Sequence, residues 1–340
     1  MNPGLRAAVL SAALASAPLC AQRLTFSRQA TTARASLRGL SVVSDQVAWA
    51  SGSGGTVLRT VDGGATWSAL PIPGAERQDF RDVKAFSDKV AYALAIAGNG
   101  GLYKTSDGGA SWTRQYASTE PGFFLDSMAF RDARHGTAVG DPMGGIFLVL
   151  DTVDGIAWKP DGTVPPALAG EGAFAASGSA IAVRGVQVWI ATGGAATARV
   201  YHRSCPTCAW SVADAPMGGR GSGSGIFSIA MCDGRHAAAV GGDYTHPEST
   251  ARSAAWSNDG GATWNAAAAM PAGYRSSVAC NPSNRKLLLA AGPTGTDLSS
   301  DGGAHWLADA KENLNSIAWS GKNGGWAVGP RGAIYRFTLR

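Results

Sequence analysis

The sequence contains few charged residues and no segment in which positive charges gather. Charged residues make up only 16% of the 340 positions, and the formal net charge of +5 is spread mostly over single arginines. Arms that bind nucleic acids usually show Lys/Arg-rich runs, and no such run is present. We therefore expect no nucleic-acid partner and at most a mild preference for acidic partners.

A run of apolar residues long enough to span a bilayer is also missing. The apolar stretch AAVLSAALASAPL (7–19) is too short for that role, follows Arg6 and leads into LCAQ (19–22). This layout is typical of a secretory signal peptide, cleaved after Ala21 or, alternatively, after Ala17. We expect residues 1–21 to be this signal peptide. Residues 22–340 should form one exported domain, periplasmic or secreted, without a membrane span.

The motifs of several enzyme classes are missing too. No strand, glycine loop and helix follow one another as a nucleotide site requires, and no serine-hydrolase elbow occurs. We expect no cofactor, no metal site and a monomer. The abundant residues instead indicate strands, because 46 glycines and 11 tryptophans with few charges are typical of many short strands joined by glycine turns.

A short motif, Ser/Thr-x-Asp-Gly-Gly-x-x-Trp, recurs through the chain. Its tryptophans are spaced by about 45 residues, stretched to the low fifties in the middle, and periods of this size indicate a propeller or another repeat array. Four full copies and one shortened copy occur: TVDGGATW (60–67), TSDGGASW (105–112), SNDGGATW (257–264), SSDGGAHW (299–306) and TVDGIAW (152–158).

Each copy belongs to a longer unit that reads as four strands. A polar turn leads into a small and apolar strand, a further strand follows, and the motif then precedes a last strand. Four antiparallel strands per repeat form a propeller blade, so the sequence predicts an all-β, seven-bladed β-propeller. The last unit holds only about three strands, and we expect QRLTFSR (22–28) to supply the fourth and close the ring. The units are 37–70, 80–116, 123–160, 172–212, 224–268, 273–309 and 314–340.

The residues of the motif have a local mechanical role. The Asp and Ser/Thr side chains can hydrogen bond to backbone amides of the turn, the Gly-Gly pair permits positive φ, and the Trp buries a large ring between sheets. The motif resembles the Asp-box, or bacterial neuraminidase repeat, whose turns lie at the rim of a propeller. Each Asp is alone in its turn, which argues against calcium loops and acid/base pairs. We expect structural roles for Asp62, Trp67, Asp107, Trp112, Asp154, Trp158, Trp210, Asp259, Trp264, Asp301 and Trp306.

The C-x-x-C pair in SCPTCAW (204–210) aligns with this motif. Counting back five residues from Trp210, as in each full copy, reaches Cys205 in the place of the Asp. We predict a Cys205–Cys208 disulfide that replaces the hydrogen bonds of the turn in an oxidising compartment. A thiol–disulfide catalyst and a zinc site are alternatives, but no helix follows the pair and no second Cys pair is present. Cys232 and Cys280 lie on nearly equivalent strands one residue out of register, which favours buried thiols over a bridge.

The ending GGWAVGPRGAIYRF (324–337) and the D-x-x-x-G-x-A-V-G turns resemble bacterial relatives of the photosystem II stability/assembly factor family. This resemblance implies a propeller that binds protein partners and assists assembly. The alternative is a glycan-binding or glycoside-hydrolase-like propeller related to sialidases. Those enzymes carry an Arg-Ile-Pro motif before the first Asp-box, whereas this chain has Arg38 in SLRGLSVV (36–43) without that motif.

Candidate ligand-binding residues come from the middle units, where extra loops interrupt the repeat. Asp141 and Asp243 follow the same Ala-Val-Gly strand in their units, which should place them near one mouth of the central channel. Glu171, Tyr244 and Arg275 lie in neighbouring irregular loops. A mouth lined by carboxylates, Tyr and Arg could bind a sugar or a peptide. The alternative is that these residues are solvated or brace adjacent blades.

Overall fold

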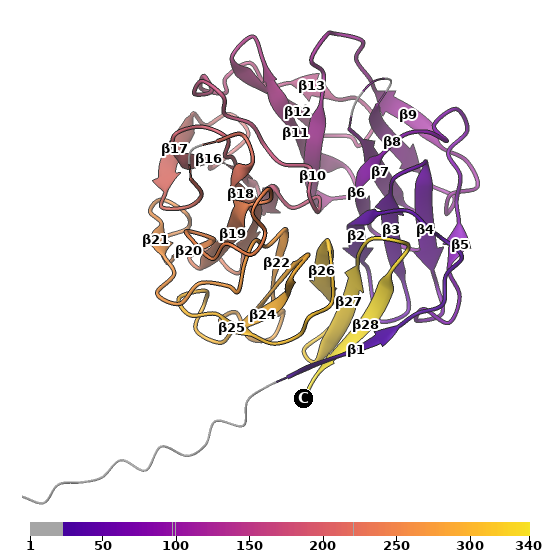
Figure 1. Cartoon of the computed structure of the whole chain (residues 1–340). Coiled ribbons are helices and arrows are strands. Elements are labelled where there is room, and N and C mark those ends of the chain that lie inside the picture. Colours follow the sequence, from indigo (N-terminus) through magenta and orange to yellow (C-terminus); the bar gives the residue numbers. More distant parts are fainter. Residues whose placement is uncertain (1–22, 97, 99, 220) are drawn as a thin grey trace, which may run out of the picture.

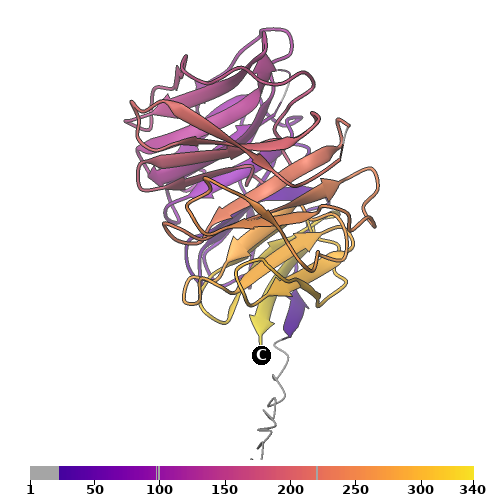
Figure 2. The ribbon, with the colours of Figure 1, turned by 90° about the vertical axis from the view of Figure 1, so that its left-hand side faces the viewer.

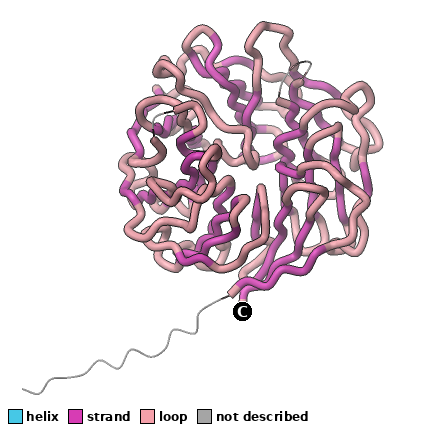
Figure 3. The backbone as a smooth tube through the Cα atoms, viewed as in Figure 1, coloured by secondary structure: helices cyan, strands magenta, loops and turns pink. Residues whose placement is uncertain are grey.

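The computed structural model describes residues 23–340 except 97, 99 and 220, so the predicted signal peptide (1–21) lies outside the described residues. Seven four-stranded antiparallel sheets form a closed ring, and the described residues contain no α-helix (Figures 1 and 3). The all-β, seven-bladed propeller predicted from the repeats is confirmed. None of the described segments forms a helix of the length and apolarity needed to cross a membrane.

Each of the first six blades takes its strands from one continuous stretch, ordered from the channel outward. Blades 1 to 3 are β2 (Leu37–Val42), β3 (Ala48–Gly52), β4 (Thr56–Thr60), β5 (Ser68–Ala69); β6 (Phe80–Ala85), β7 (Ala91–Ala95), β8 (Gly101–Thr105), β9 (Thr113–Tyr116); and β10 (Leu125–Asp132), β11 (His135–Met143), β12 (Ile146–Thr152), β13 (Lys159–Pro160). Blades 4 to 6 are β14 (Ile181–Arg184), β15 (Gln187–Ala191), β16 (Ala198–Arg203), β17 (Trp210–Ala215); β18 (Ser224–Met231), β19 (Ala237–Asp243), β20 (Ala254–Ser257), β21 (Asn265–Ala266); and β22 (Ser277–Cys280), β23 (Leu288–Gly292), β24 (Gly295–Ser299), β25 (Leu307–Ala308).

Blade 7 joins the two ends of the chain. Its strands β26 (Ser316–Trp319), β27 (Gly324–Val328) and β28 (Ile334–Leu339) are completed by β1 (Leu24–Arg28), as the sequence predicted. Phe26 pairs with Phe337, and β1 runs antiparallel to β28 over its whole length (Figure 2). β1 is therefore the outermost strand of blade 7 and covers the edge of β28, so that this blade has four strands like the other six.

The second strand of each blade is buried on both faces, because blades pack against each other on either side. The strands AWASG (β3), AYALA (β7) and LLAAG (β23) are buried at every position. Larger side chains fill the space between blades. Between blades 1 and 2, for example, Trp49 and Val57 pack against Phe80 and Tyr103. Alternating small and large side chains of this kind explains the high content of alanine and tryptophan.

A ring of polar side chains ties the inner strands together. One residue of an inner strand accepts a hydrogen bond from a backbone amide of the next blade, and this bond satisfies the buried amide. The bonds join Asp82 Oδ2 to Met128 N at 2.9 Å, Ser127 Oγ to Ala180 N at 3.3 Å, Ser228 Oγ to Val278 N at 2.9 Å and Ser277 Oγ to Ile317 N at 3.3 Å.

The recurring Asp-Gly-Gly-Trp turns connect the third and fourth strands of their blades. In the first, Asp62 Oδ1 accepts hydrogen bonds from Thr60 Oγ1 (2.8 Å) and from Thr66 N (2.9 Å), while Thr60 Oγ1 accepts one from Gly64 N (2.9 Å). Asp107, Asp259 and Asp301 repeat this pattern, and Asp154 makes the corresponding bonds in its shortened turn. The turns thus have the hydrogen bonds expected of a rim motif.

The tryptophans of these turns pack in three ways. The rings of Trp67 and Trp112 meet Trp326 and Trp49 edge to face, at 5.5 and 6.4 Å between centroids. Trp264 instead closes its own turn, donating from Nε1 to Gly261 O at 3.1 Å. Trp306 makes the same bond to Gly303 O at 3.0 Å, and Trp158 and Trp210 are buried in inter-blade clusters.

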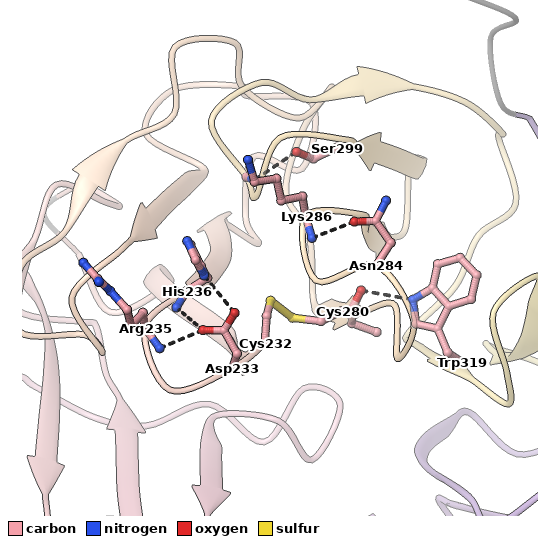
Figure 4. Close-up of a disulfide and its surroundings, with 11 residues drawn as sticks. Cys232, Asp233, Arg235, His236, Cys280, Asn284, Lys286, Ser299 and Trp319 are labelled. Atoms are coloured by element: carbon pink, nitrogen blue, oxygen red, sulfur yellow. Dashed lines mark hydrogen bonds and ion pairs between the residues drawn. A yellow bond between two sulfur atoms is a disulfide. The ribbon is translucent and has the colours of Figure 1, made fainter.

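The predicted Cys205–Cys208 disulfide is present, and Cys208 N donates to Cys205 O at 3.0 Å, which closes the turn before Trp210. The expectation of free thiols at Cys232 and Cys280 was wrong. These residues form a second disulfide, with their Cα atoms 5.4 Å apart, between blades 5 and 6 (Figure 4). Cys232 lies past the end of β18 in a turn closed by His236 O, so strand register does not fix its distance from Cys280. Two disulfides indicate an oxidising environment.

Candidate functional site

Side chains from the starts of the inner strands converge on one mouth of the channel. In blades 1, 2, 3 and 5 the inner strand has a β-bulge near its start. A bulge leaves one residue out of the ladder and re-aims its side chain. The residues at these bulges are Arg38, Arg81, Asp126 and Phe227, and all four line a cavity at the mouth.

Residues 172–179, which we call the crossing segment, replace the start of the inner strand in blade 4. The sequence unit was expected to begin at 172, but β14 begins only at Ile181. The crossing segment extends beyond the adjoining blade 3 to blade 2, where Arg81 Nη1 donates to Ala175 O at 3.0 Å and Lys84 Nζ donates to Gly178 O at 2.8 Å. It therefore braces blade 4 against blade 2 across the channel.

Two further features hold the crossing segment in place. Ser177 Oγ donates to Ser276 O of blade 6 at 2.6 Å, and Arg38 Nη1 of blade 1 donates to Ala176 O at 3.3 Å. Gly178 has φ of 69°, and a Cβ there would lie 2.2 Å from Asp82 Oδ1. Only glycine fits this close approach to the neighbouring carboxylate.

The cavity above the crossing segment has a volume of about 1060 Å³. This is the size of a site for a ligand much larger than a single small metabolite. Its wall divides by chemistry, with charged side chains from blades 1 to 3 and aromatic side chains from the crossing segment and blades 5 and 6. The main contributors are Arg38, Arg81, Asp126 and Asp141 on the charged part and Phe174, Phe227, Tyr244 and Tyr274 on the aromatic part.

The aromatic rings pack mainly on one another. Phe174 stacks on Phe227 with centroids 3.8 Å apart, and Tyr274 meets Phe227 at 4.7 Å in an edge-to-face arrangement. Burial raises the pKa of the Tyr274 hydroxyl, which is nearly enclosed. The rings of Tyr244 and Phe227 meet edge to face, with their centroids 6.1 Å apart. Tyr244 is 54% exposed, so its ring is the one in this cluster most open to a ligand.

Two carboxylates border the charged part of the cavity. Asp126 is 0% exposed, and neither of its oxygens has a partner at hydrogen-bonding geometry among the described residues. Burial raises its pKa well above the ordinary value, the nearby Asp141 raises it further, and Arg81 and the Ala175 amide lower it. Asp141 accepts a hydrogen bond from Ala173 N at 3.2 Å, and burial raises its pKa as well.

The arginines of the cavity differ in how they are compensated. Arg81 donates to Asp79 Oδ2 at 2.7 Å, whereas Arg38 makes no ion pair within the part of the chain that the structure describes. Burial lowers the pKa of Arg38, and the neighbouring charge of Arg81 lowers it further. No group of three or more His, Cys, Asp or Glu side chains among the described residues could hold a metal ion.

Of the five candidate residues, Asp141, Glu171 and Tyr244 line the cavity. The carboxylate of Glu171 is fully engaged: it accepts from Thr192 Oγ1 at 2.6 Å and forms a buried ion pair with Arg199. Burial acts to raise its pKa, but the bonds from Arg199 and Thr192 outweigh that effect and lower it. Glu171 thus braces the loop that forms one wall.

Asp243 and Arg275 lie outside the cavity lining. Asp243 caps the turn after β19 by accepting from Thr245 N at 2.9 Å and pairing with His246 Nδ1 at 3.0 Å. Arg275 is 1% exposed and forms a buried ion pair with Asp297. Both side chains are committed to local structure.

Three charged residues were not predicted from the sequence to lie at the mouth: Arg38, Arg81 and Asp126. A pattern was available, because each is the second residue of its inner strand and follows a large apolar residue, as in LRG (37–39), FRD (80–82) and LDS (125–127). Aligning these inner strands on their first apolar residue would have placed all three side chains at one mouth.

No protein-family model matches the sequence, and no curated protein sequence matches it. Solved structures do match. YCF48 from Cyanidioschyzon merolae is 17% identical with a TM-score of 0.64, over 92% of this chain and 98% of its own. YCF48 bound to a D1 peptide and the WD40 repeats of RRP9 are each 14% identical, with TM-scores of 0.64 over 93% of this chain and 97% of theirs. At these identities the likeness shows the fold alone: the chain is a seven-bladed β-propeller similar in fold to YCF48 and to WD40 repeats.

Proposed function

We propose that this protein is a binding module that holds a segment of a protein partner in the cavity at the channel mouth. The observation that carries the proposal is the mixed lining of the cavity, which has a volume of about 1060 Å³ and contains both a stacked aromatic cluster and charged side chains of both signs. A peptide presents apolar and charged groups a few ångströms apart along one chain. A wall with both apolar and charged groups therefore suits a peptide better than it suits a uniformly polar ligand.

The packing of the aromatic rings favours a peptide over a glycan. Sugars bind to aromatic side chains through open ring faces, whereas Phe174 and Phe227 cover each other and Tyr274 is buried. A glycan is the second candidate, because the ring of Tyr244 is exposed. YCF48, a protein of similar fold, has been solved with a D1 peptide, which supports peptide binding by a propeller of this kind.

We further propose that the protein acts outside the cytoplasm, as the Asp-box and assembly-factor resemblances suggest. The disulfides Cys205–Cys208 and Cys232–Cys280 support this location. The predicted signal peptide over residues 1–21 would provide the route. Residues 22–340 would form the single binding domain.

The test compares peptides and glycans on the intact protein and on a blocked cavity. An immobilised sample is exposed to a position-scanning library of acetylated and amidated octapeptides and, separately, to a glycan array. Ala169→Trp places a large side chain at an exposed position of the cavity wall, and Ala266→Trp makes the same change on the exposed outer strand of blade 5.

We expect octapeptides to be retained by the wild type and by Ala266→Trp and to be lost from Ala169→Trp. Retention of glycans alone would overturn the proposal in favour of the second candidate. Peptide retention that Ala169→Trp leaves unchanged would place the binding surface elsewhere on the ring.

A further inference from the structure

Asp126 is a buried carboxylate whose surroundings do not satisfy it. Both oxygens are inaccessible to solvent and have no partner at full hydrogen-bonding geometry among the described residues, although the Ala175 amide lies beside the carboxylate and the residue borders the cavity. A buried carboxylate in that state costs free energy that a partner would recover. The buried carboxylate of Asp82 on the neighbouring blade is compensated, because it accepts from Met128 N and forms an ion pair with Lys84. Asp126 differs from Asp82 in that neither of its oxygens has a partner at full hydrogen-bonding geometry among the described residues.

The charges around the cavity leave one carboxylate in excess. Glu171 is paired with Arg199, and Arg81 is paired with Asp79. The guanidinium of Arg38 then stands against the two carboxylates of Asp126 and Asp141. With both carboxylates ionised, one additional positive charge supplied by a ligand would bring this region to neutrality.

The backbone of the crossing segment runs past both carboxylates. Ala173 N donates to Asp141, and the Ala175 amide lies beside Asp126. Ala173 and Ala175 carry only methyl side chains, and Phe174 between them stacks on Phe227. A ligand cation that displaced the Ala175 amide would meet Asp126 and would have Asp141 as its neighbour.

We propose that the cavity selects ligands carrying a cationic side chain, a lysine or an arginine, and that Asp126 and Asp141 together bind its ammonium or guanidinium group. The proposal rests on the proposed function, since it names the residue type that a bound peptide must contain. Arg38, on blade 1, remains available for a carboxylate or carbonyl of the same peptide.

The electrostatics of Asp126 support this assignment. Its raised pKa, caused by burial and by Asp141, means that the free protein holds a proton there at pH values where an exposed Asp is ionised. A ligand cation favours the ionised carboxylate and displaces this proton. Arg81 and the Ala175 amide also face Asp126, but Arg81 is already paired with Asp79.

The experiment uses the full mature chain and the same acetylated, amidated octapeptide library, whose members have no terminal charges. The best-retained peptide is then resynthesised with its Lys or Arg replaced by norleucine, and both peptides are titrated by calorimetry. Asp126→Asn removes the charge with little change in shape, and Asp214→Asn makes the same change on the exposed face of β17.

We expect the wild type and Asp214→Asn to retain pools with Lys or Arg at one position and to bind the norleucine peptide on the order of tenfold more weakly. Asp126→Asn should bind the two peptides within about threefold of each other. Circular dichroism and the melting temperature establish that each variant is folded.

Retention of octapeptides without a preference for Lys or Arg would overturn this inference and leave the proposed function standing. So would a preference for acidic residues, which would assign recognition to Arg38 and Arg81 instead. Retention of no octapeptide at all would overturn the proposed function and, with it, the inference.

Discussion

The guanidinium of Arg81 in blade 2 donates a hydrogen bond of 3.0 Å to the carbonyl oxygen of Ala175 in blade 4, across the channel. This bond holds the crossing segment where it forms the floor of the cavity. Arg81→Met keeps most of the side-chain stem and removes the donor. We expect amide exchange in residues 173–178 to become roughly five- to tenfold faster, which corresponds to about 1 kcal/mol for one hydrogen bond. Exchange in the same peptide should be unchanged in Arg77→Met, a substitution at an exposed arginine nearby.

The two disulfides should contribute unequally to stability. Cys232 and Cys280 are 48 residues apart, whereas Cys205 and Cys208 are three apart. Loop-closure entropy predicts losses of about 4 and about 2 kcal/mol when each pair is replaced by alanine. Urea unfolding of the two double variants measures both losses. Equal losses would contradict the entropic argument, and unmodified thiols in a non-reduced peptide map would contradict the pairing itself.

The closing strand β1 should be an integral part of the fold. Phe26 packs against Tyr335 and Phe337 with centroids 6.0 Å away in each case. Because the ring is only partly buried, Phe26→Ala should lower the free energy of unfolding by about 1–2 kcal/mol. Ser27→Ala, on the exposed face, should have almost no effect. Fast hydrogen exchange at residues 24–28 in the folded protein would show that β1 is not part of blade 7.

The rim turns should make the protein sensitive to acid. Hydrogen bonds from Ser111 and Thr105 lower the pKa of Asp107 to about 2, and Asp62 is lowered to the same value by Thr66 and Thr60. A lowered pKa in the folded state contributes stability above the unfolded pKa near 4, and this contribution is lost as the pH falls toward 2. Asp107→Asn should therefore be less stable than the wild type at pH 7 and should approach it near pH 2.

Urea unfolding followed by tryptophan fluorescence between pH 7 and pH 2 measures this difference. Asp88→Asn, at an exposed position without the turn hydrogen bonds, is the matched control. A difference between wild type and Asp107→Asn that stays constant with pH would show that the carboxylate charge does not matter.

Asp126 should have the opposite effect on stability. Below about pH 4 its carboxyl is protonated in both states, and above that value the unfolded chain releases the proton while burial retains it in the fold. Stability should thus fall as the pH rises toward the folded pKa. Asp126→Asn should remove this fall and be more stable than the wild type at pH 7 by about 1–3 kcal/mol, with the gain shrinking toward pH 4. A variant less stable than the wild type at pH 7 would indicate a partner for the carboxylate.

The repeat made most of the ring predictable, because strand pairing within a blade is local and its turn residues recur. Even the closing strand followed from counting, since a seventh unit with three strands requires a fourth. The crossing segment could not be predicted in this way. Its contacts, such as Lys84 to Gly178, join residues nearly one hundred positions apart, and its Gly, Ala and Ser residues carry no periodic pattern.

The mouth residues were missed for a different reason. Asp141 was identified because an irregular loop follows it, but Arg81 and Asp126 lie inside regular strands, and only the bulge turns their side chains toward the cavity. The pairing of Cys232 with Cys280 likewise depends on a turn that strand register does not describe.

The crossing segment also changes how the seven blades depend on one another. In a repeat array whose units touch only their neighbours, stability is close to a sum of local terms, and one unit can open while others remain folded. Here blade 4 is bonded to blades 1, 2 and 6 through Ala176, Ala175 and Ser177. Opening blade 4 would break contacts with blades that do not adjoin it, so the ring should melt as one unit instead of fraying blade by blade.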